Sequence, residues 1–217
     1  MKKPRIGISL RVVNAANYDE KRDALSQDWP KLLEELGYVP VYVPNTLQNI
    51  SNFLEELHLD GIIFSGGENL GENKERDNTE KKLLEYALSR KLPIIGVCRG
   101  MQLINEYFGG SLSIIDSDKH ITKKHELKII DDKFQSLFKS SKINTNSYHR
   151  NTIKKNQIGN KLKPFAIFEN DTSIEGFFHE TLPVLGVMWH PERNSKSNDK
   201  LILFTIFSNN IFLWTKN

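Results

Sequence analysis

The sequence predicts an α/β fold in which helices cover both faces of a mostly parallel sheet. In the first half of the chain, short apolar segments alternate with amphipathic segments of helical period. Strands that are apolar on both faces are typical of parallel sheets buried between helices. In the second half, strand-like segments follow one another across short turns, which indicates an antiparallel extension. No repeat, low-complexity tract or linker divides the chain, so we expect one domain over residues 1–217.

The elements of the first half follow from their apolar patterns and boundary residues. Pro30 near the start of one helix and Gly37 after its end are typical boundary residues. Asp77 and Glu80 have the spacing of a capping box, which would begin another helix. We expect strands at residues 5–10, 39–44, 61–67 and 92–97, and helices at 28–37, 49–61, 77–88 and 99–110.

The second half changes character, because its apolar segments are strand-like and lie close together. The most apolar run, residues 201–214, is too short and too interrupted to span a membrane, so we expect a helix that packs on the sheet. Strands are expected at residues 125–130, 165–170, 173–179 and 184–190, a loop at 14–24, and exposed polar loops at 116–126 and 193–200.

Composition and charge exclude several classes of function. The 30 basic and 27 acidic residues give a net charge of +3, and the basic residues are scattered, so we expect no nucleic-acid polymer as a partner. A single cysteine allows no internal disulfide and no cysteine-based zinc site. The N-terminus lacks the long apolar segment of a signal peptide. We therefore expect a cytoplasmic protein with no membrane partner.

The single cysteine, Cys98, lies where a predicted strand meets a predicted helix. Gly96 and Gly100 flank it in the pattern G-x-C-x-G, which matches a nucleophile elbow with cysteine in place of serine. Parallel sheets place their sites at the carboxyl ends of strands, and a following helix favours a thiolate at its N-terminus. The backbone N–H of Arg99 would then be able to donate to an oxyanion. The alternative is a buried structural cysteine.

His190 and Glu192 are the residues expected to serve this cysteine. A thiolate nucleophile needs a proton carrier, and the carrier needs an orienting group. His190 lies at the end of another predicted strand in the segment WHPE, and Glu192 follows two residues later. The alternative is that each is an ordinary packing or surface residue. Together with the elbow they favour a Cys-His-Glu catalytic triad.

These two motifs together resemble the class I glutamine amidotransferases, and more narrowly the free-standing γ-glutamyl hydrolases of peptidase family C26. The resemblance covers nearly the whole chain and implies a three-layer αβα, flavodoxin-like fold. It implies that Gly67, in Ser65-Gly66-Gly67, provides the second oxyanion donor beside Arg99. Gln102 completes the family pattern G-x-C-x-G-x-Q. Asn146, Ser147, Tyr148 and His149 resemble the N-S-x-H segment that lies along a bound γ-glutamyl group.

Two further stretches support the hydrolase branch. Arg76, Asp77 and Glu80 resemble its R-D-x-x-E helix start, although a simple helix cap is the alternative for the two acidic residues. Residues 174–176 resemble the strand that precedes the catalytic histidine. The chain departs from the branch after the double glycine, at residues 68–71, and after the N-S-x-H segment, at Arg150 and Asn151. These departures bear on the substrate rather than on the reaction.

The resemblance implies hydrolysis of a γ-glutamyl amide through a γ-glutamyl thioester, with no metal or organic cofactor. Basic residues in the predicted loops suit an anionic leaving group: Arg11, Lys21, Arg22 and Arg150. Among members of the branch, those that release an amidated nucleotide from γ-glutamyl-CDP-amidate for capsule biosynthesis resemble the chain best. The alternatives are hydrolysis of γ-glutamyl-GABA and a glutaminase subunit that delivers ammonia to a partner. A redox-sensing cysteine would require neither His190 nor Glu192. The oligomeric state cannot be read from the sequence.

Overall fold

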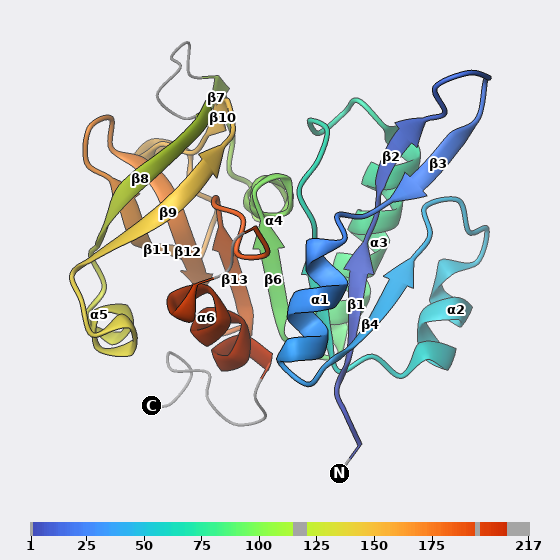
Figure 1. The fold of residues 1–217 in the computed structure, drawn as a ribbon, viewed down its shortest axis with the longest axis horizontal. Coiled ribbons are helices and arrows are strands. Elements are labelled where there is room, and N and C mark those ends of the chain that lie inside the picture. Colours follow the sequence, from blue (N-terminus) through green and yellow to red (C-terminus); the bar gives the residue numbers. More distant parts are fainter. Residues whose placement is uncertain (1, 115–120, 194–195, 208–217) are drawn as a thin grey trace.

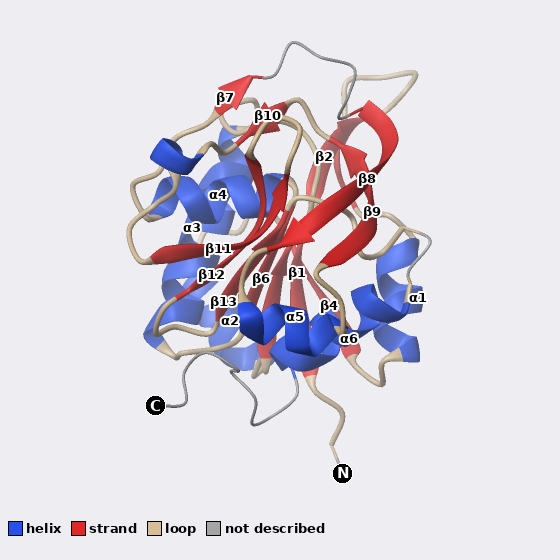
Figure 2. Ribbon diagram, turned by 90° about the vertical axis from the view of Figure 1, so that its left-hand side faces the viewer, coloured by secondary structure: helices blue, strands red, loops and turns tan. Residues whose placement is uncertain are grey.

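A nine-stranded sheet between two layers of helices forms the protein (Figures 1 and 2). The computed structural model describes residues 2–114, 121–193 and 196–207. The strand order is β4-β1-β5-β6-β13-β12-β11-β8-β9. The first five strands in this order run parallel, and the last four continue from β13 in antiparallel pairs. The structure confirms the predicted α/β class and its antiparallel extension.

The parallel strands and the helices that connect them match the predicted elements closely. The strands are β1 (Arg5–Ser9), β4 (Val39–Val43), β5 (Gly61–Phe64), β6 (Ile94–Val97) and β13 (Val184–Val187). The helices of this part are α1 (Asp28–Glu35), α2 (Ile50–Leu57), α3 (Lys74–Ser89) and α4 (Arg99–Tyr107). As predicted, Gly37 follows α1, and its φ of +82° is accessible mainly to glycine.

The antiparallel part contains β8 (Ile121–Ile129), β9 (Lys142–Tyr148), β11 (Leu162–Phe168) and β12 (Ser173–His179). The remaining elements are β2 (Arg11–Asn14), β3 (Lys21–Ala24), β7 (Ser113–Ile114), α5 (Asp132–Phe138), β10 (Asn151–Thr152), the short 3₁₀ helix at Lys155–Gln157 and α6 (Ser197–Phe207). The hairpin of β2 and β3 stands above the carboxyl ends of the parallel strands (Figure 1).

Two apolar cores lie on the two faces of the sheet. On one face, Trp29 and Leu33 of α1 pack with Ile202 and Ile206 of α6. On the other face, α2, α3 and α4 bury apolar side chains against β5, β6 and β13. The prediction that the C-terminal helix packs on the sheet is confirmed for residues 197–207, and the rest of the predicted run, residues 208–214, lies outside the described residues. Among the described helices, each is too short or too polar to cross a lipid bilayer.

Several local predictions are wrong. Asp77 and Glu80 do not cap α3, because Asn73 is its N-cap, accepting from Arg76 N, and the two acidic side chains bind arginines instead. The predicted loop at 116–126 is strand from residue 121 onward, and residues 116–120 lie outside the described residues.

Other errors concern polar segments that the fold turns into regular structure. The loop expected at 14–24 contains the last residue of β2 and all of β3, and residues 197–200 of the loop expected at 193–200 belong to α6. Residues 188–190, expected at the end of a strand, follow β13 as non-strand backbone. Seven described elements had no predicted counterpart: β2, β3, β7, α5, β9, β10 and the 3₁₀ helix.

Candidate active site

The site lies at the carboxyl ends of the parallel strands, where β6 and β13 are neighbours. The backbone N–H of Cys98 donates to the carbonyl oxygen of Val187 at 2.8 Å, so the chain after β6 is fixed to the end of β13. Three residues beyond Val187, the chain reaches His190. Cysteine and histidine are therefore brought together by the pairing of two strands that are far apart in the sequence.

Cys98 occupies the strained turn expected of a nucleophile elbow. Its φ of +51° and ψ of −105° are rare for a residue with a side chain. The flanking glycines are needed for close packing: a Cβ on Gly96 would lie 2.4 Å from the carbonyl oxygen of Gly100, and one on Gly100 would lie 2.2 Å from that of Phe64. The elbow therefore requires both glycines of the G-x-C-x-G pattern.

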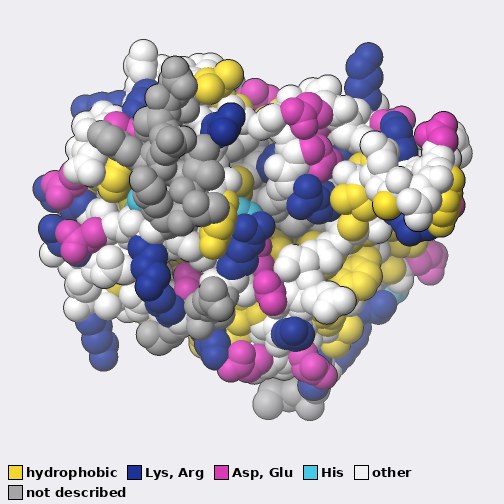
Figure 3. Space-filling view, turned by 45° about the horizontal axis from the view of Figure 1, so that its top comes forward, with side chains coloured by type: hydrophobic (Ala, Val, Ile, Leu, Met, Phe, Trp, Pro, Cys, Tyr) yellow, Lys and Arg dark blue, Asp and Glu magenta, His cyan; other side chains and the backbone are white. Residues whose placement is uncertain are grey.

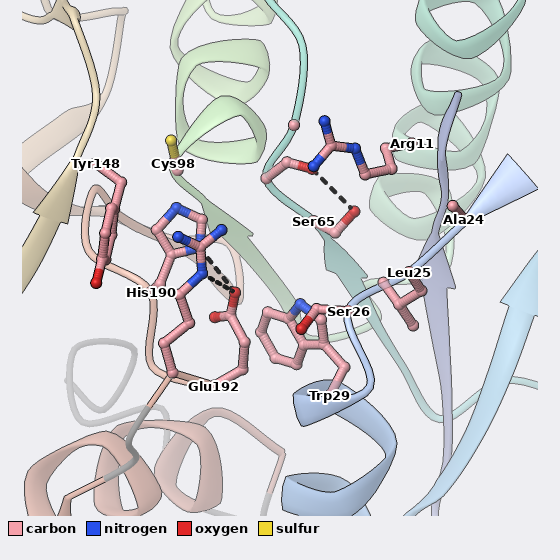
Figure 4. A pocket seen from close by; sticks show the side chains of 13 residues that line it. Arg11, Ala24, Leu25, Ser26, Trp29, Ser65, Cys98, Tyr148, His190 and Glu192 are labelled. Carbon is pink, nitrogen blue, oxygen red and sulfur yellow. Dashed lines mark hydrogen bonds and ion pairs between the residues drawn. The ribbon is translucent and has the colours of Figure 1, made fainter. Parts of the chain in front are cut away.

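His190 and Glu192 form a buried pair beside the thiol (Figure 4). The Nδ1 atom of His190 lies 2.7 Å from Glu192 Oε1, which leaves Nε2 on the side of Cys98. The His190 ring packs against Gly66, where an added Cβ would lie 2.7 Å from Cε1. The structure thus brings the three predicted triad residues together, with the carboxylate behind the imidazole and the thiol in front of it.

The electrostatics favour a thiolate–imidazolium pair. Burial opposes ionisation of Cys98, but the hydrogen bond to His190 and the charge of that ring outweigh burial and lower the pKa of the thiol. Burial likewise opposes protonation of His190, but its hydrogen bonds to Cys98 and Glu192 raise the pKa of the imidazole to about 9. The lowered pKa of the thiol favours the nucleophilic thiolate, and at neutral pH the histidine holds a proton that it can donate.

The residues around the histidine segment hold it in place. The side chain of Asn146 donates to the carbonyl oxygen of His190 at 2.8 Å and accepts from its backbone N–H at 2.9 Å. Tyr148 meets the His190 ring edge to face, at 5.8 Å between ring centroids. The guanidinium of Arg193 also lies over the Tyr148 ring, 4.5 Å from its centroid. The predicted N-S-x-H segment therefore supports the histidine directly.

Two cavities meet at Cys98. One, of about 170 Å³, contains the triad residues and is here called the histidine cavity; it is lined by Arg11, Ala24, Leu25, Ser26, Trp29, Ser65, Gly66, Gly67, Cys98, Tyr148, His190, Glu192 and Arg193. The other, of about 270 Å³, is called the glutamine cavity and is lined by Gly67, Asn69, Cys98, Arg99, Gln102, Tyr148, His149, Arg150 and Asn151. In Figure 3 this end of the molecule is hollowed, and basic side chains border the hollow.

The predicted substrate residues fall into two groups. Gln102, Tyr148 and His149 line the glutamine cavity, as do the two residues predicted to donate to an oxyanion, Gly67 and Arg99. Asn146 and Ser147 line neither cavity: Asn146 holds the histidine segment, and the side chain of Ser147 is fully buried.

Gln102, which lines the glutamine cavity, carries a buried acceptor. The residue is buried, and within the described part of the chain its Oε1 atom has no hydrogen-bond donor. A buried amide oxygen without a donor is costly, so this atom is a candidate to bind an N–H group of a substrate.

His149 forms a second buried pair with Glu175 of β12, at 3.4 Å between Nε2 and Oε1. Its Nδ1 atom lies 2.9 Å from the carbonyl oxygen of Asn151. Burial opposes protonation, but the charge of Glu175 and the hydrogen bond to it raise the pKa of His149. The pair with Glu175 therefore favours the protonated form of His149, at the wall of the glutamine cavity.

The predicted basic residues do not all face the site. Arg11 lines the histidine cavity and Arg150 the glutamine cavity, whereas Lys21 and Arg22 make exposed ion pairs with Glu75 and Glu20.

Five residues that line the histidine cavity were not predicted from the sequence. Arg193 was missed although it follows Glu192 directly. The others, Ala24, Leu25, Ser26 and Trp29, carry no motif, because only the folded chain brings the end of β3 and the start of α1 to Cys98.

The two departures from the family pattern lie against one another. Asn69 follows the double glycine, and Asn151 follows the N-S-x-H segment. Asn151 Nδ2 donates to Asn69 Oδ1 at 2.8 Å, and both residues line the glutamine cavity. This hydrogen bond joins the loop after β5 to the start of β10 at the wall of the cavity.

Comparisons with known proteins show the family of the chain. The sequence profile of the peptidase C26 family matches residues 4–192. The chain is 34% identical to the γ-glutamyl-CDP-amidate hydrolase of Campylobacter jejuni over 94% of this chain and 97% of that protein. It is 33% identical to a subunit of the glutamine-hydrolysing GMP synthase of Pyrococcus furiosus over 75% of this chain and 80% of that protein.

A solved structure shows the same fold. The glutaminase domain of Trypanosoma brucei CTPS, crystallised with bound acivicin, superimposes on the chain with a TM-score of 0.68. The two sequences are 15% identical, and the match covers 98% of this chain and 96% of that domain. At this level of identity the likeness shows the glutamine amidotransferase-like fold that the sequence predicted.

Proposed function

The chain belongs to the peptidase C26 family, and we propose that it is a cysteine-dependent γ-glutamyl hydrolase that forms a γ-glutamyl thioester and releases L-glutamate. The observation that carries this proposal is the buried arrangement of Cys98, His190 and Glu192 at the meeting point of two cavities. We further propose that it acts in the cytoplasm on γ-glutamyl-CDP-amidate and releases an amidated nucleotide.

In the first half-reaction, the Cys98 thiolate attacks the γ-carbonyl carbon and forms a C–S bond. The carbonyl electrons move to oxygen, and the backbone N–H groups of Gly67 and Arg99 stabilise that oxyanion. His190 then donates its Nε2 proton to the leaving nitrogen, the C–N bond breaks, and the γ-glutamyl thioester remains. Glu192 keeps the imidazole in the orientation that this transfer needs.

In the second half-reaction, neutral His190 takes a proton from water as the water oxygen attacks the thioester carbonyl. The same two N–H groups stabilise the second oxyanion. The C–S bond breaks, the thiolate returns, and glutamate leaves. The imidazolium–thiolate pair is thereby restored, so no metal or organic cofactor is needed for the cycle.

The two cavities can be assigned to the two halves of the substrate. His190 lines the histidine cavity and not the glutamine cavity, and the leaving nitrogen must lie within reach of His190. The leaving group therefore occupies the histidine cavity. The γ-glutamyl group then occupies the glutamine cavity, where Gln102 Oε1 can accept from its ammonium group and His149 supplies positive charge for its α-carboxylate.

Charged residues of the histidine cavity favour an anionic leaving group. Arg11 and Arg193 line this cavity, and neither has its charge fully neutralised by a close carboxylate: Arg193 Nε is 3.8 Å from Glu192 Oε1, and Arg11 has no ion pair among the described residues. Guanidinium groups bind phosphate oxygens by paired hydrogen bonds. The similarity to the C. jejuni hydrolase over nearly the full length of both chains supports the same choice.

The competing function is that of a glutaminase that passes ammonia to a partner protein. The similarity to GMP synthase subunits favours it, although it covers a smaller part of the chain. Ammonia is small and uncharged, so such a glutaminase has no use for arginines beside the leaving nitrogen. Hydrolysis of γ-glutamyl-GABA is the other alternative, and its leaving group carries one carboxylate.

The test is glutamate release by the purified protein from glutamine, γ-glutamyl-GABA, a γ-glutamyl peptide and γ-glutamyl-CDP-amidate, with Cys98→Ala as the inactive control. We expect the highest kcat/KM with γ-glutamyl-CDP-amidate. Release from γ-glutamyl-GABA alone would establish the other hydrolase activity. Glutamine turnover that appears only when cell extract is added would favour the partnered glutaminase.

Matched variants test the assignment of the histidine cavity. Arg11→Gln and Arg193→Gln are each expected to raise KM for γ-glutamyl-CDP-amidate about tenfold, since a charge-assisted hydrogen bond contributes roughly 1.5 kcal/mol or more. Lys21→Gln is the control, because Lys21 pairs with Glu75 and does not line the cavity. Equal KM values in all three variants would contradict the assignment.

A further inference from the structure

Two buried arginines lie next to the site, and the reaction described above uses neither side chain. The side chain of Arg76, from α3, is 0% exposed, and that of Arg99, from the first turn of α4, is 1% exposed. Buried guanidinium groups are rare unless they are paired and hydrogen-bonded. The groups that pair with these two guanidinium groups therefore indicate which parts of the site they hold in place.

Arg76 holds the loop that contains Gly67. Its Nη2 atom donates to the carbonyl oxygens of Ser65, at 2.8 Å, and Gly66, at 3.2 Å. Its Nη1 atom donates to Glu68 Oε2 at 2.9 Å, so the guanidinium binds loop residues on both sides of Gly67. A Cβ on Gly67 would lie 2.4 Å from Nη1, and its φ of +149° also favours glycine.

Glu80 joins this arginine to the nucleophile elbow. One carboxylate oxygen accepts from Arg76 Nε at 2.9 Å, and the other accepts from Arg99 Nη1. Arg99 also pairs with Asp77. An unbroken chain of charge-assisted contacts therefore runs from the backbone of Ser65 and Gly66 through Arg76 and Glu80 to Arg99.

The chain of contacts connects two groups that must be placed together. The proposed oxyanion donors, the N–H groups of Gly67 and Arg99, lie after different strands, β5 and β6, and catalysis requires both to meet one oxygen. Buried ion pairs contribute little net stability, because desolvation offsets their attraction. A buried chain at this place is better explained by the position that it gives to the two donors.

We infer that Arg76 is a positioning residue, which acts with Glu80 to hold the Gly67 loop at a fixed distance from the Arg99 N–H and so forms the oxyanion hole. The inference rests on the proposed roles of Cys98, Gly67 and Arg99, and it does not depend on the natural leaving group. Arg76 itself lines neither the histidine cavity nor the glutamine cavity.

The experiment compares two reactions of the same cysteine in Arg76→Lys. Hydrolysis of γ-glutamyl-p-nitroanilide passes through an oxyanion, whereas alkylation of Cys98 by iodoacetamide is a displacement at carbon that forms none. Lysine preserves the charge that pairs with Glu80 but loses the forked contacts to Ser65 and Gly66. Arg90→Lys is the matched control, because Arg90 follows α3 at its other end and makes an exposed ion pair with Glu55.

We expect kcat for hydrolysis to fall about 100-fold in Arg76→Lys, the order of effect of displacing an oxyanion donor. KM for hydrolysis and the rate of alkylation should stay within about threefold of the wild-type values. The pH dependence of alkylation should match that of the wild type. Arg90→Lys should match the wild type in both reactions. Glu80→Gln provides a second variant, in which the same selective loss of hydrolysis is expected.

Three results would overturn the inference. Hydrolysis in Arg76→Lys within about threefold of the wild type would show that the loop keeps its position without the guanidinium. Equal losses of hydrolysis and alkylation would show a general disturbance of the fold or of the Cys98–His190 pair. Wild-type Cys98 that failed to react with iodoacetamide would refute the proposed nucleophile, and the inference with it.

Discussion

Two histidine–carboxylate pairs flank Cys98, and their hydrogen bonds give them different capacities. In the first pair, His190 Nδ1 faces Glu192 and Nε2 is left for the thiol. In the second, His149 Nδ1 lies on the carbonyl oxygen of Asn151 and Nε2 faces Glu175. Both ring nitrogens of His149 are therefore occupied. A histidine–carboxylate pair is therefore not enough for proton transfer. The histidine can transfer protons only if the carboxylate binds one ring nitrogen and leaves the other available.

The largest expected difference between the pairs is in the histidines themselves. His190→Asn should lower kcat by roughly 10⁴-fold, because it removes the proton carrier of both half-reactions. His149→Asn should lower kcat/KM by only about tenfold, through weaker substrate binding and a higher pKa of Cys98, to which the His149 charge contributes. Steady-state kinetics of both variants would measure this, and equal losses would contradict the comparison.

Substituting the two carboxylates should also lower kcat more in the first pair than in the second, but the difference should be smaller than for the histidines. Glu192→Gln is expected to lower kcat by roughly 100-fold or more, because the amide cannot stabilise the imidazolium that forms beside Cys98. Glu175→Gln should lower kcat by less than about tenfold, because His149 transfers no proton in the mechanism. A Glu175→Gln variant as slow as Glu192→Gln would assign His149 a direct role in proton transfer.

The pH dependence should carry the signature of His190. The raised pKa of His190 means that the folded state favours the protonated ring. The stability that the protonated ring contributes to the fold is complete below the ordinary pKa near 6.5 and is lost as the pH rises through about 9. We therefore expect alkylation of Cys98 to begin below the usual thiol pKa, and kcat/KM to fall above about pH 9. Glu192→Gln should move the alkaline fall to lower pH, whereas Glu175→Gln should leave it in place.

The smallest expected effect concerns the support of the second pair. Ser173 Oγ donates to Glu175 Oε1 at 3.2 Å. Ser173→Ala should lower the free energy of unfolding by about 1 kcal/mol, the usual contribution of such a hydrogen bond, and leave kcat within about twofold. Thermal or urea unfolding with parallel kinetics would measure both, and a large loss of kcat would show that Glu175 requires exact orientation for catalysis.

The parallel half of the fold was predicted well because its signals are local. Apolar strands, Gly37 after α1 and the G-x-C-x-G elbow each depend on residues that are neighbours in the sequence. The antiparallel half was predicted less well, because β9 and the start of β8 are rich in lysine, asparagine and threonine, and are strands only because each pairs with the other. Polar edge strands lack the apolar pattern that identifies buried ones.

In the site, too, the features with local sequence signals were predicted and those that depend on long-range contacts were not. The elbow and the WHPE segment were sufficient to predict which three residues meet. The capping-box interpretation of Asp77 and Glu80 was wrong because the spacing fits a helix start, whereas Arg99, 22 and 19 residues away, captures both carboxylates. Likewise the role of Asn146 depends on the backbone of His190, 44 residues distant. Such long-range contacts leave no local pattern in a single sequence.

The central claim is that a γ-glutamyl thioester on Cys98 is common to all substrates, and partitioning between water and hydroxylamine tests it most directly. Two γ-glutamyl amides with different leaving groups would be hydrolysed in the presence of the same concentration of hydroxylamine, and the ratio of γ-glutamyl hydroxamate to glutamate would be measured. We expect the same ratio from both substrates, because both pass through one thioester after the leaving group has departed. A ratio that changes with the leaving group, or release of glutamate with no hydroxamate at any hydroxylamine concentration, would contradict it.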